Sequence, residues 1–381
     1  VPNHVANTMS SPYYRFDGSN DEIAIADNDH MSFGDGTSDN QFSISAWIYM
    51  EEASDFQIFN KGTYNSDGEY RFECSGSDKL SLLLFDESGA STFERATTTA
   101  TIPENKWVHV CATYNGVGGA SANGGITLYL NGVSEALSLD GNGTYVAMES
   151  LASEVRIGNS ADSTYSRGSI QNLKIWNKEL TATEIKDDYS GASVPFKYKG
   201  ANQTALLTGN DSTLGGGNNW GFAYLSGSNV NNTVAGKMYL LGNGNADYTY
   251  ISNKVTKGKA YNWSLKARLN TGSSTAIRIG SVGVSGCYSE FTPTGTEQTF
   301  SGTFVAGGTE LQLGLSTSLD GIAFEIDDIT LTLAGAVAEY DGSSAGALKW
   351  GDKSGNDLHG TVSGATLENT PYDSGTEYEE G

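Results

Sequence analysis

Large apolar side chains occupy every second position of residues 42–50, which read Phe-Ser-Ile-Ser-Ala-Trp-Ile-Tyr-Met. Successive side chains of an extended strand point to opposite faces, so this period of two places alternate residues on one face. The residues of that face are Phe42, Ile44, Ala46, Ile48 and Met50. The segment therefore predicts a strand with one apolar face.

Similar short apolar runs recur along the chain between clusters of Gly, Asn, Asp and Ser. The 381 residues include 48 Gly but only 6 Pro, and 20 Tyr raise the aromatic content to 10%. Disordered chains lack aromatic and β-branched residues, so the composition excludes a disordered protein. Short apolar runs between turn residues are typical of β-sandwiches. We therefore expect an all-β protein whose length suits two domains.

The expected strands fall into two groups, one in residues 13–191 and one in residues 205–335. The first group is 42–50, 56–60, 69–74, 80–85, 107–114, 126–131, 154–158 and 170–176; the second is 237–241, 247–252, 261–269, 275–280, 297–304, 310–316 and 322–333. Asn131-Gly132 predicts a tight hairpin. Thr181, with Glu184 three residues later, predicts a short capped helix that ends near Tyr189.

The remaining segments are expected to serve as connections or ends. Residues 192–204 are a linker, and residues 336–381 form a C-terminal segment that carries a short strand and ends in an acidic tail. The three cysteines, Cys74, Cys111 and Cys287, are spaced too widely for a disulfide framework or a metal site. We expect buried free thiols at Cys74 and Cys111, with a bridge between these two as the open alternative.

The formal net charge is −23, which repels a phosphate backbone, so nucleic acid is not an expected partner. No run of 18 apolar residues occurs, so we expect no membrane insertion.

Five stretches of residues 13–191 resemble, in order, motifs of the laminin-G-like, concanavalin-A-like lectin superfamily. They begin at Tyr14 (Tyr-Arg-Phe-Asp-Gly), Phe42 (Phe-Ser-Ile-Ser-Ala-Trp-Ile), Lys106 (Lys-Trp-Val-His-Val), Leu128 (Leu-Tyr-Leu-Asn-Gly) and Gly168 (Gly-Ser-Ile-Gln-Asn). The resemblance implies a jelly-roll sandwich of two sheets and suggests Asp17 and Asp21 as calcium ligands. The family often has Asp where this chain has Gln171 and Asn172, whose amide oxygens bring no charge to calcium.

Residues 205–335 resemble the jelly-roll carbohydrate-binding modules, with a galactose-binding-type fold, that occur beside xylanases and glucanases. The similar stretches are 258–261, 299–304 and 324–331. In that family an Asp pair of the last strand, together with acidic or amide groups near the start of the module, binds a structural calcium. The resemblance therefore implies Asn210, Asp211, Asp327 and Asp328 as calcium ligands.

Residues 352–365 resemble the element that usually opens a laminin-G-like module, and no such element precedes Tyr14. A sandwich without an edge strand exposes unpaired backbone groups. We therefore expect the tail to supply that strand, to the first module of its own chain, to a neighbouring chain or to a further module. This module order also resembles fibre and decoration proteins of tailed bacteriophages.

Laminarinase-type hydrolases of the same superfamily use Glu-x-Asp-x-x-Glu on one strand, where the two Glu act as nucleophile and as acid/base. This chain has Glu325-Ile326-Asp327-Asp328-Ile329-Thr330, and a threonine cannot transfer that proton near neutral pH. The four His and three Cys show no zinc spacing. We therefore expect no enzyme activity.

Sugar recognition needs flat aromatic faces together with planar amide and carboxylate groups. In the second module the expected contacts are Trp220, Tyr224, Tyr248 and Tyr250, with Trp220 first because Asn-Asn-Trp-Gly reads as a loop. In the first module they are the polar-loop residues Tyr64, Asp67, Asp162, Tyr165 and Arg167.

We therefore expect a non-catalytic virion-surface protein, in a fibre, tail or capsid decoration, whose modules attach to a host-surface glycan. The expected partners are that glycan and other virion proteins or copies of itself, with structural calcium as the expected ion and a virion-surface or extracellular location. Two alternatives stay open. One is a secreted bacterial adhesin or the accessory binding region of a polysaccharide-degrading enzyme; the other is a pair of assembly modules that bind no sugar.

Overall fold

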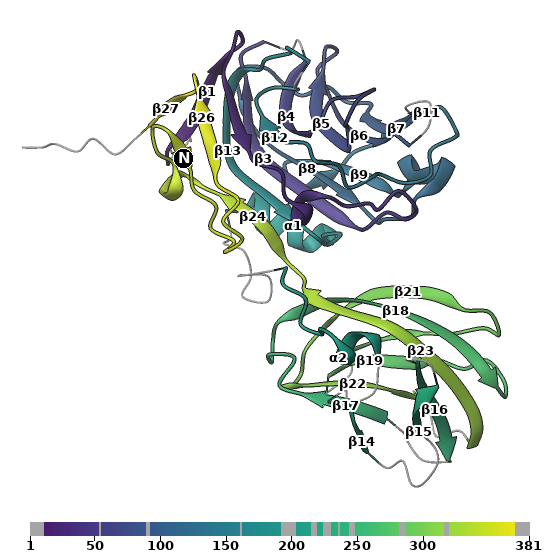
Figure 1. Cartoon of the computed structure of the whole chain (residues 1–381). Coiled ribbons are helices and arrows are strands. Elements are labelled where there is room, and N and C mark those ends of the chain that lie inside the picture. The colour runs from purple at the N-terminus through teal and green to yellow at the C-terminus, as the bar shows by residue number, and fades with distance from the viewer. Residues whose placement is uncertain are drawn as a thin grey trace, which may run out of the picture. The chain divides into compact units, whose positions relative to one another are not determined.

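A computed structural model describes residues 11–52, 55–88, 92–160, 162–191, 203–214, 219–223, 230–234, 237–243, 248–281, 287–315 and 320–369. The chain divides into two units (Figure 1). Unit 1 comprises Val1–Val194 together with Ala336–Gly381, and unit 2 comprises Pro195–Gly335. Strands dominate both units, so the expected all-β class is confirmed.

Unit 1 contains an eight-stranded sheet, named sheet A, with the order β10-β9-β8-β3-β13-β1-β27 and with β24 also paired to β13. Its strands are β1 (Tyr13–Asp17), β3 (Phe42–Met50), β8 (Trp107–Tyr114), β9 (Ile126–Leu130), β10 (Val133–Ser134), β13 (Arg167–Trp176), β24 (Ala336–Tyr340) and β27 (Thr366–Glu368). The expected hairpin joins β9 to β10, because Asn131 and Gly132 both have positive φ, at 50° and 77°.

A nine-stranded sheet, named sheet B, has the order β11-β7-β6-β5-β4-β12-β2-β26-β25. Its strands are β2 (Glu22–Ile25), β4 (Phe56–Lys61), β5 (Tyr70–Ser75), β6 (Lys79–Asp86), β7 (Thr92–Thr98), β11 (Leu137–Gly141), β12 (Val155–Ile157), β25 (Lys349–Trp350) and β26 (Gly360–Ser363). Three short 3₁₀ turns, η1 (Asp29–Met31), η2 (Gly119–Gly125) and η4 (Gly342–Ser344), lie in the connections.

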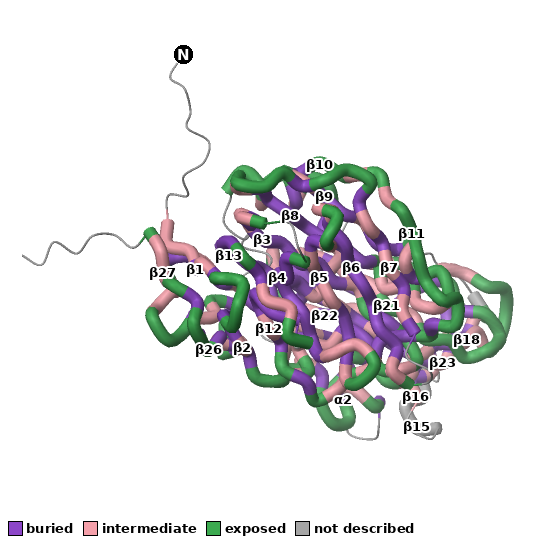
Figure 2. Tube along the Cα trace, turned by 90° about the horizontal axis from the view of Figure 1, so that it is seen from above, coloured by how far each residue is buried: buried purple, intermediate pink, exposed green. Residues whose placement is uncertain are grey.

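One apolar core draws on strands of both sheets of unit 1. The alternate residues of β3, Phe42 to Met50, are all at most 1% exposed, which confirms the face expected from the period of two. Figure 2 shows this burial along the middle strands, while the outer strands β10 and β11 are exposed. Cys74 and Cys111 are buried free thiols on different sheets, so the open alternative of a bridge between them is not formed.

The helix α1 (Ala182–Tyr189) begins with the expected capping box of Thr181 and Glu184. Asp188 fixes the helix to sheet A, because its carboxylate accepts hydrogen bonds from Ser45 Oγ at 2.7 Å and Lys174 Nζ at 2.5 Å and lies 3.0 Å from His109 Nε2. Burial alone would raise the pKa of Asp188, but His109 and Lys174 outweigh it and hold that pKa well below its usual value. None of the helices in the described ranges is long and apolar enough to cross a membrane.

The C-terminal segment 336–369 pairs with unit 1 of its own chain at three places. β24 pairs with residues 173–176 of β13, β26 with β2, and β27 with β1. β1 already pairs with the other half of β13, at residues 167–170, so β24 and β1 share one edge of this strand. The described ends also meet, because Asn369 Nδ2 donates to the carbonyl oxygen of Ser11 at 3.2 Å.

Gln171 lies on β13 between the residues that pair with β1 and the residues that pair with β24. Its Nε2 donates to the carbonyl oxygens of Ser11 and Pro12, both at 2.9 Å, and the residue is fully buried. A carboxylate at this position has no proton to donate to two carbonyls. The amide that departs from the family's Asp therefore has a structural role here.

Unit 2 contains two five-stranded sheets, named sheet E, with the order β14-β17-β22-β19-β20, and sheet F, with the order β15-β16-β23-β18-β21. The strands are β14 (Gly221–Ala223), β15 (Val230–Val234), β16 (Lys237–Asn243), β17 (Tyr248–Ser252), β18 (Ala260–Thr271), β19 (Ile277–Ser281), β20 (Tyr288–Phe291), β21 (Gln298–Val305), β22 (Glu310–Leu315) and β23 (Asp320–Leu333). A one-turn helix, α2 (Asn210–Thr213), precedes them, and a second apolar core fills this unit.

We predict that unit 1 depends on the C-terminal segment for its stability. Trp350 is fully buried, its ring lies 4.9 Å from Tyr14 and 5.4 Å from Tyr340, and its Nε1 donates to the Asp341 carbonyl oxygen. Removing a buried aromatic side chain costs about 3–5 kcal/mol, so Trp350→Ala should lower the free energy of unfolding of unit 1 by that amount. Urea denaturation measures it.

The matched control is Leu348→Ala, because Leu348 is only two residues away but 78% exposed, and it should leave the transition unchanged. Truncation of residues 336–381 should destabilise unit 1 further. A truncated chain that melts like the full chain would contradict the role of the tail.

Candidate functional site

The outer face of sheet E gathers tyrosines and planar polar groups. In β17 the residues Thr249 and Ile251 are buried, while Tyr248 and Tyr250 alternate with them and are half-buried on the other face. The same alternation in β19, β20 and β22 turns apolar residues to the core. The outer face thus holds Tyr248, Tyr250, Arg278, Tyr288, Glu290, Glu310 and Gln312.

One row of residues crosses this face from strand to strand. Tyr250 is opposite Gln312, Gln312 is opposite Gly280, and Gly280 is opposite Tyr288. Neighbouring strands are about 4.8 Å apart, so the backbone positions of the two tyrosines are roughly 14 Å apart. The row therefore has an aromatic ring at each end, with an amide and a glycine between them.

Charged side chains flank this row on both sides, with Arg278 and Glu290 on one side and Glu310 on the other. Arg278 Nε donates to Glu290 Oε1 at 2.8 Å, and the Arg278 guanidinium lies over the Tyr288 ring, 4.2 Å from its centroid. Gln312 Nε2 donates to Glu310 at 2.8 Å. These contacts hold planar hydrogen-bonding groups next to the rings and neutralise the guanidinium.

The edge strand β14 supports Tyr250. Gly221 is opposite Tyr250, and a Cβ added at Gly221 would lie 2.8 Å from Cζ of the tyrosine ring. The ring therefore extends over this glycine. Thr249 Oγ1 adds a hydrogen bond to the Gly221 carbonyl oxygen at 2.7 Å, which ties β14 to β17.

Trp220, the residue that the sequence favoured as a sugar platform, is instead part of the core of unit 2. It is 5% exposed, and its Nε1 donates to the Asp211 carbonyl oxygen at 2.9 Å. The indole ring is covered and its N–H is hydrogen-bonded, so the prediction that Trp220 is an exposed sugar platform was wrong. Tyr224 lies outside the described residues.

Two of the first-unit candidates come together on the outer face of sheet B. The Tyr64 ring lies 5.0 Å from the Phe85 ring, and the Arg71 guanidinium lies 5.9 Å from the Phe85 centroid. Arg71 Nη2 in turn donates to Asp162 Oδ2 at 3.0 Å. Beside them, Asn60 Oδ1 and Arg71 Nε are buried atoms without a partner among the described residues.

The other three candidates make contacts of their own. Asp67 accepts a hydrogen bond from the Thr63 backbone N–H at 2.9 Å and so closes the turn that contains Tyr64. Tyr165 forms an isolated β-bridge with Asn159, in the loop that contains Asp162. Arg167 begins β13 in sheet A, where it lies 3.5 Å from both Glu51 and Glu52. Arg167 therefore belongs to the other sheet.

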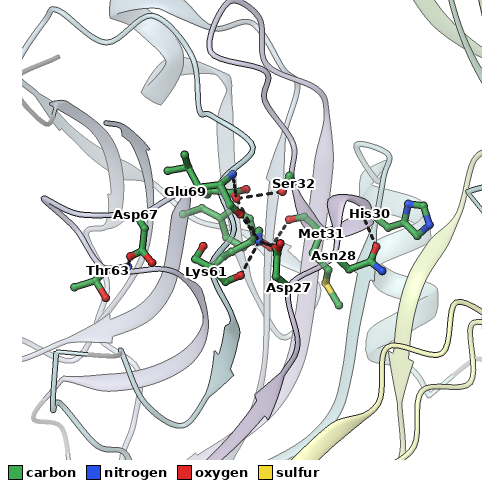
Figure 3. Close-up of polar contacts among 12 residues, drawn as sticks. Asp27, Asn28, His30, Met31, Ser32, Lys61, Thr63, Asp67 and Glu69 are labelled. Atoms are coloured by element: carbon green, nitrogen blue, oxygen red, sulfur yellow. Dashed lines mark hydrogen bonds and ion pairs between the residues drawn. The ribbon is translucent and has the colours of Figure 1, made fainter. Parts of the chain in front are cut away.

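The buried ammonium of Lys61 contacts residues from three separate parts of unit 1, and Figure 3 shows it beside Asp27 and Glu69. Lys61 is fully buried, and its Nζ lies 2.7 Å from Asp27 Oδ1, 2.9 Å from the Ser153 carbonyl oxygen and 3.3 Å from Glu69 Oε1. Glu69 is also fully buried and accepts from Ser32 Oγ at 3.1 Å. Sequence reasoning missed this pair, because its partners come from loops far apart in the chain.

Burial raises the pKa of Glu69 to about 7, although Lys61 and the hydrogen bonds to Glu69 act in the opposite direction. The folded state therefore binds this proton more tightly than the unfolded state, whose value is 4.5. The stability that the group contributes is fully present below 4.5 and is lost as the pH rises through about 7.

We predict that Glu69→Gln, which cannot ionise, makes unit 1 less sensitive to pH. Between pH 5 and pH 8 the wild type should lose on the order of 3 kcal/mol more stability than the variant. Denaturant midpoints at the two pH values measure the difference. Glu154→Gln is the matched control, because the Glu154 side chain is 53% exposed. Parallel pH profiles of the wild type and Glu69→Gln would disprove the assignment.

The predicted calcium ligands do not converge. Asp21 accepts from the Asp17 backbone N–H and Asp17 from that of Ser19, both at 2.8 Å, so each carboxylate closes a turn. Asp328 pairs with Lys266 at 2.7 Å, and Asp327 lies 3.8 Å from Lys237. Within the described ranges no three His, Cys, Asp or Glu residues gather where they could hold a metal ion. Calcium binding stays a prediction that the placement of these ligands does not support.

The groups considered for catalysis are engaged in structural contacts. Glu325 bonds to Arg268 Nε at 2.7 Å in sheet F. The Ser45 hydroxyl donates to Asp188 rather than to His109, so these three residues do not form an activated nucleophile. His109 is itself buried, at 1% exposed.

Two solved structures show the range of similarity. A heptameric SAP-like pentraxin from Limulus polyphemus is 19% identical, with a TM-score of 0.34, over 49% of this chain and 84% of the pentraxin. A xylan-binding domain from Paenibacillus barcinonensis is 17% identical, with a TM-score of 0.28, over 35% of this chain and 97% of that domain. No curated protein matches the sequence.

The first part of unit 1 matches a family model. The matched residues are 17–186, and the model is described as the concanavalin A-like lectin/glucanases superfamily. This segment contains four of the five motifs in full and the last two residues of the first, Asp17 and Gly18. Residues 17–186 are therefore similar to the concanavalin A-like lectin/glucanases superfamily.

Proposed function

We propose that this chain is a non-catalytic glycan-binding protein that holds its ligand on the outer face of sheet E. The observation that carries the proposal is the row Tyr250, Gln312, Gly280 and Tyr288, which holds no charged residue and has an aromatic ring at each end. The Arg278 guanidinium lies over one face of the Tyr288 ring and leaves the other face to a ligand. Aromatic faces stack on the apolar faces of sugar rings, and amides bond neighbouring hydroxyls.

The dimensions and charges of the face favour an extended, neutral oligosaccharide. The two tyrosines are roughly 14 Å apart across the sheet, which exceeds one sugar ring. The guanidinium of Arg278 is already paired with Glu290, so it leaves little charge to attract an acidic sugar.

Unit 1 offers a second candidate contact surface, around Arg71 and Asp162 on sheet B. The similarity of residues 17–186 to a lectin family supports it, as do the unpartnered buried atoms of Asn60 and Arg71. We place it second because its central aromatic ring, that of Phe85, is only 1% exposed, whereas the tyrosines of sheet E are half-buried.

We further propose that the protein acts outside a cell, on a virion fibre, tail or decoration, where it attaches to a host-surface glycan beside other virion proteins or copies of itself. The support is the resemblance of residues 352–365 and of the module order to phage fibre proteins. In the alternative, in which the chain is a secreted bacterial adhesin, the same face of sheet E binds the glycan. Labelling the chain on purified particles by immunoelectron microscopy separates the two locations.

We predict that Tyr250→Ala and Tyr288→Ala each weaken glycan binding about tenfold or more, because truncating an aromatic contact residue costs at least about 1.4 kcal/mol. A glycan array identifies ligands, and calorimetry then measures the affinities. Tyr239→Ala is the matched control, since Tyr239 lies on sheet F opposite Glu325. An array without any bound glycan would favour the alternative of assembly modules that bind no sugar.

A further inference from the structure

We infer that Lys254 is a built-in cation that takes the place of a structural calcium in unit 2 and positions the edge of the tyrosine face. Lys254 Nζ lies 3.3 Å from Asp211 Oδ2 and donates to the Leu206 carbonyl oxygen at 3.2 Å. Asp211 is one of the residues that the carbohydrate-binding-module resemblance offers to calcium. The Lys254 ammonium therefore pairs with the carboxylate that was expected to bind calcium.

The rest of the Asp211 carboxylate is also committed to N–H donors. The Asn219 backbone N–H donates to Oδ1 at 2.7 Å, and Asn219 Nδ2 lies 3.1 Å from each carboxylate oxygen. Burial alone would raise the pKa of Asp211, but the Asn219 hydrogen bonds and the ammonium of Lys254 hold it below its usual value. The carboxylate is thus ionised and satisfied without a metal.

Calcium needs six to eight oxygen ligands, several of them charged, and a positive charge at contact distance opposes it. The other acidic candidates cannot complete such a set as they are placed. Asp328 pairs with Lys266 at 2.7 Å, and Asp327 has Lys237 at 3.8 Å. The donor set therefore fits an ammonium and does not fit calcium.

The ammonium acts on the tyrosine face through a short chain of contacts. Asp211 holds Asn219 by its carboxylate and Trp220 by its carbonyl oxygen, which accepts from Nε1 at 2.9 Å. The next residue is Gly221, which begins β14 and lies under the Tyr250 ring. Lys254 thus fixes the strand on which Tyr250 rests, and this link to ligand binding rests on the proposed function.

Calorimetry and hydrogen exchange of the full chain test the inference without any glycan. The wild type should melt at the same temperature with added Ca²⁺ and with excess EDTA. Lys254→Gln should lower the melting temperature of unit 2 by several degrees and speed amide exchange in residues 219–223, whereas Lys254→Arg should restore both. Lys266→Gln is the matched control, because Lys266 pairs with Asp328 while 45% exposed, and it should change neither.

Two results would overturn the inference. One is a wild-type melting temperature that rises with Ca²⁺ and falls with EDTA; the other is a Lys254→Gln variant that behaves like Lys266→Gln. For a bound glycan, Lys254→Gln should weaken binding severalfold, and EDTA should not affect the wild type. Glycan binding that requires calcium would refute the inference about Lys254 and leave the proposed function intact. A protein whose stability does not depend on calcium, but which binds no glycan, would refute only the proposed function.

Discussion

The pairing of β13 along both of its edges is the constraint on which the rest of unit 1 depends. One edge is covered by β3, while the other is divided between β1 and β24, which are more than 300 residues apart in sequence. Unpaired backbone groups inside a sandwich are costly, so the segment after unit 2 must return to complete the sheet. At this junction the side-chain amide of Gln171 donates hydrogen bonds to the carbonyl oxygens of Ser11 and Pro12. Unit 2 is consequently an insertion between α1 and β24.

Much of this fold was predictable from local patterns. The strand over Phe42–Met50, the Asn131-Gly132 hairpin and the cap at Thr181 all follow from rules that operate within a few residues. The tail was predicted to supply an edge strand, and the structure has that strand paired within the same chain. β2, β14 and β20 were not predicted, because three or four residues are too few to show a period of two. The longer strands β7, β11 and β15 were missed as well.

The candidate site was harder to predict, because exposure depends on contacts that no local pattern contains. Trp220 stands in a run typical of loops, yet its indole N–H has a partner in α2 that draws the ring into the core. Tyr248 and Tyr250, which were predicted as sugar contacts, lie on the outer face of β17, since their buried neighbours Thr249 and Ile251 alternate with them. Arg278 and Gln312 were missed, although the same alternation in β19 and β22 marks them as outward-facing residues.

The meeting of Ser11 and Asn369 has a consequence for how unit 1 is built into a chain. The first and last described residues of this fold are hydrogen-bonded neighbours, so its two described ends lie at one place. A module fused at either residue would therefore join unit 1 at that same place. Such a unit can be inserted between other modules without any change to its own strand order.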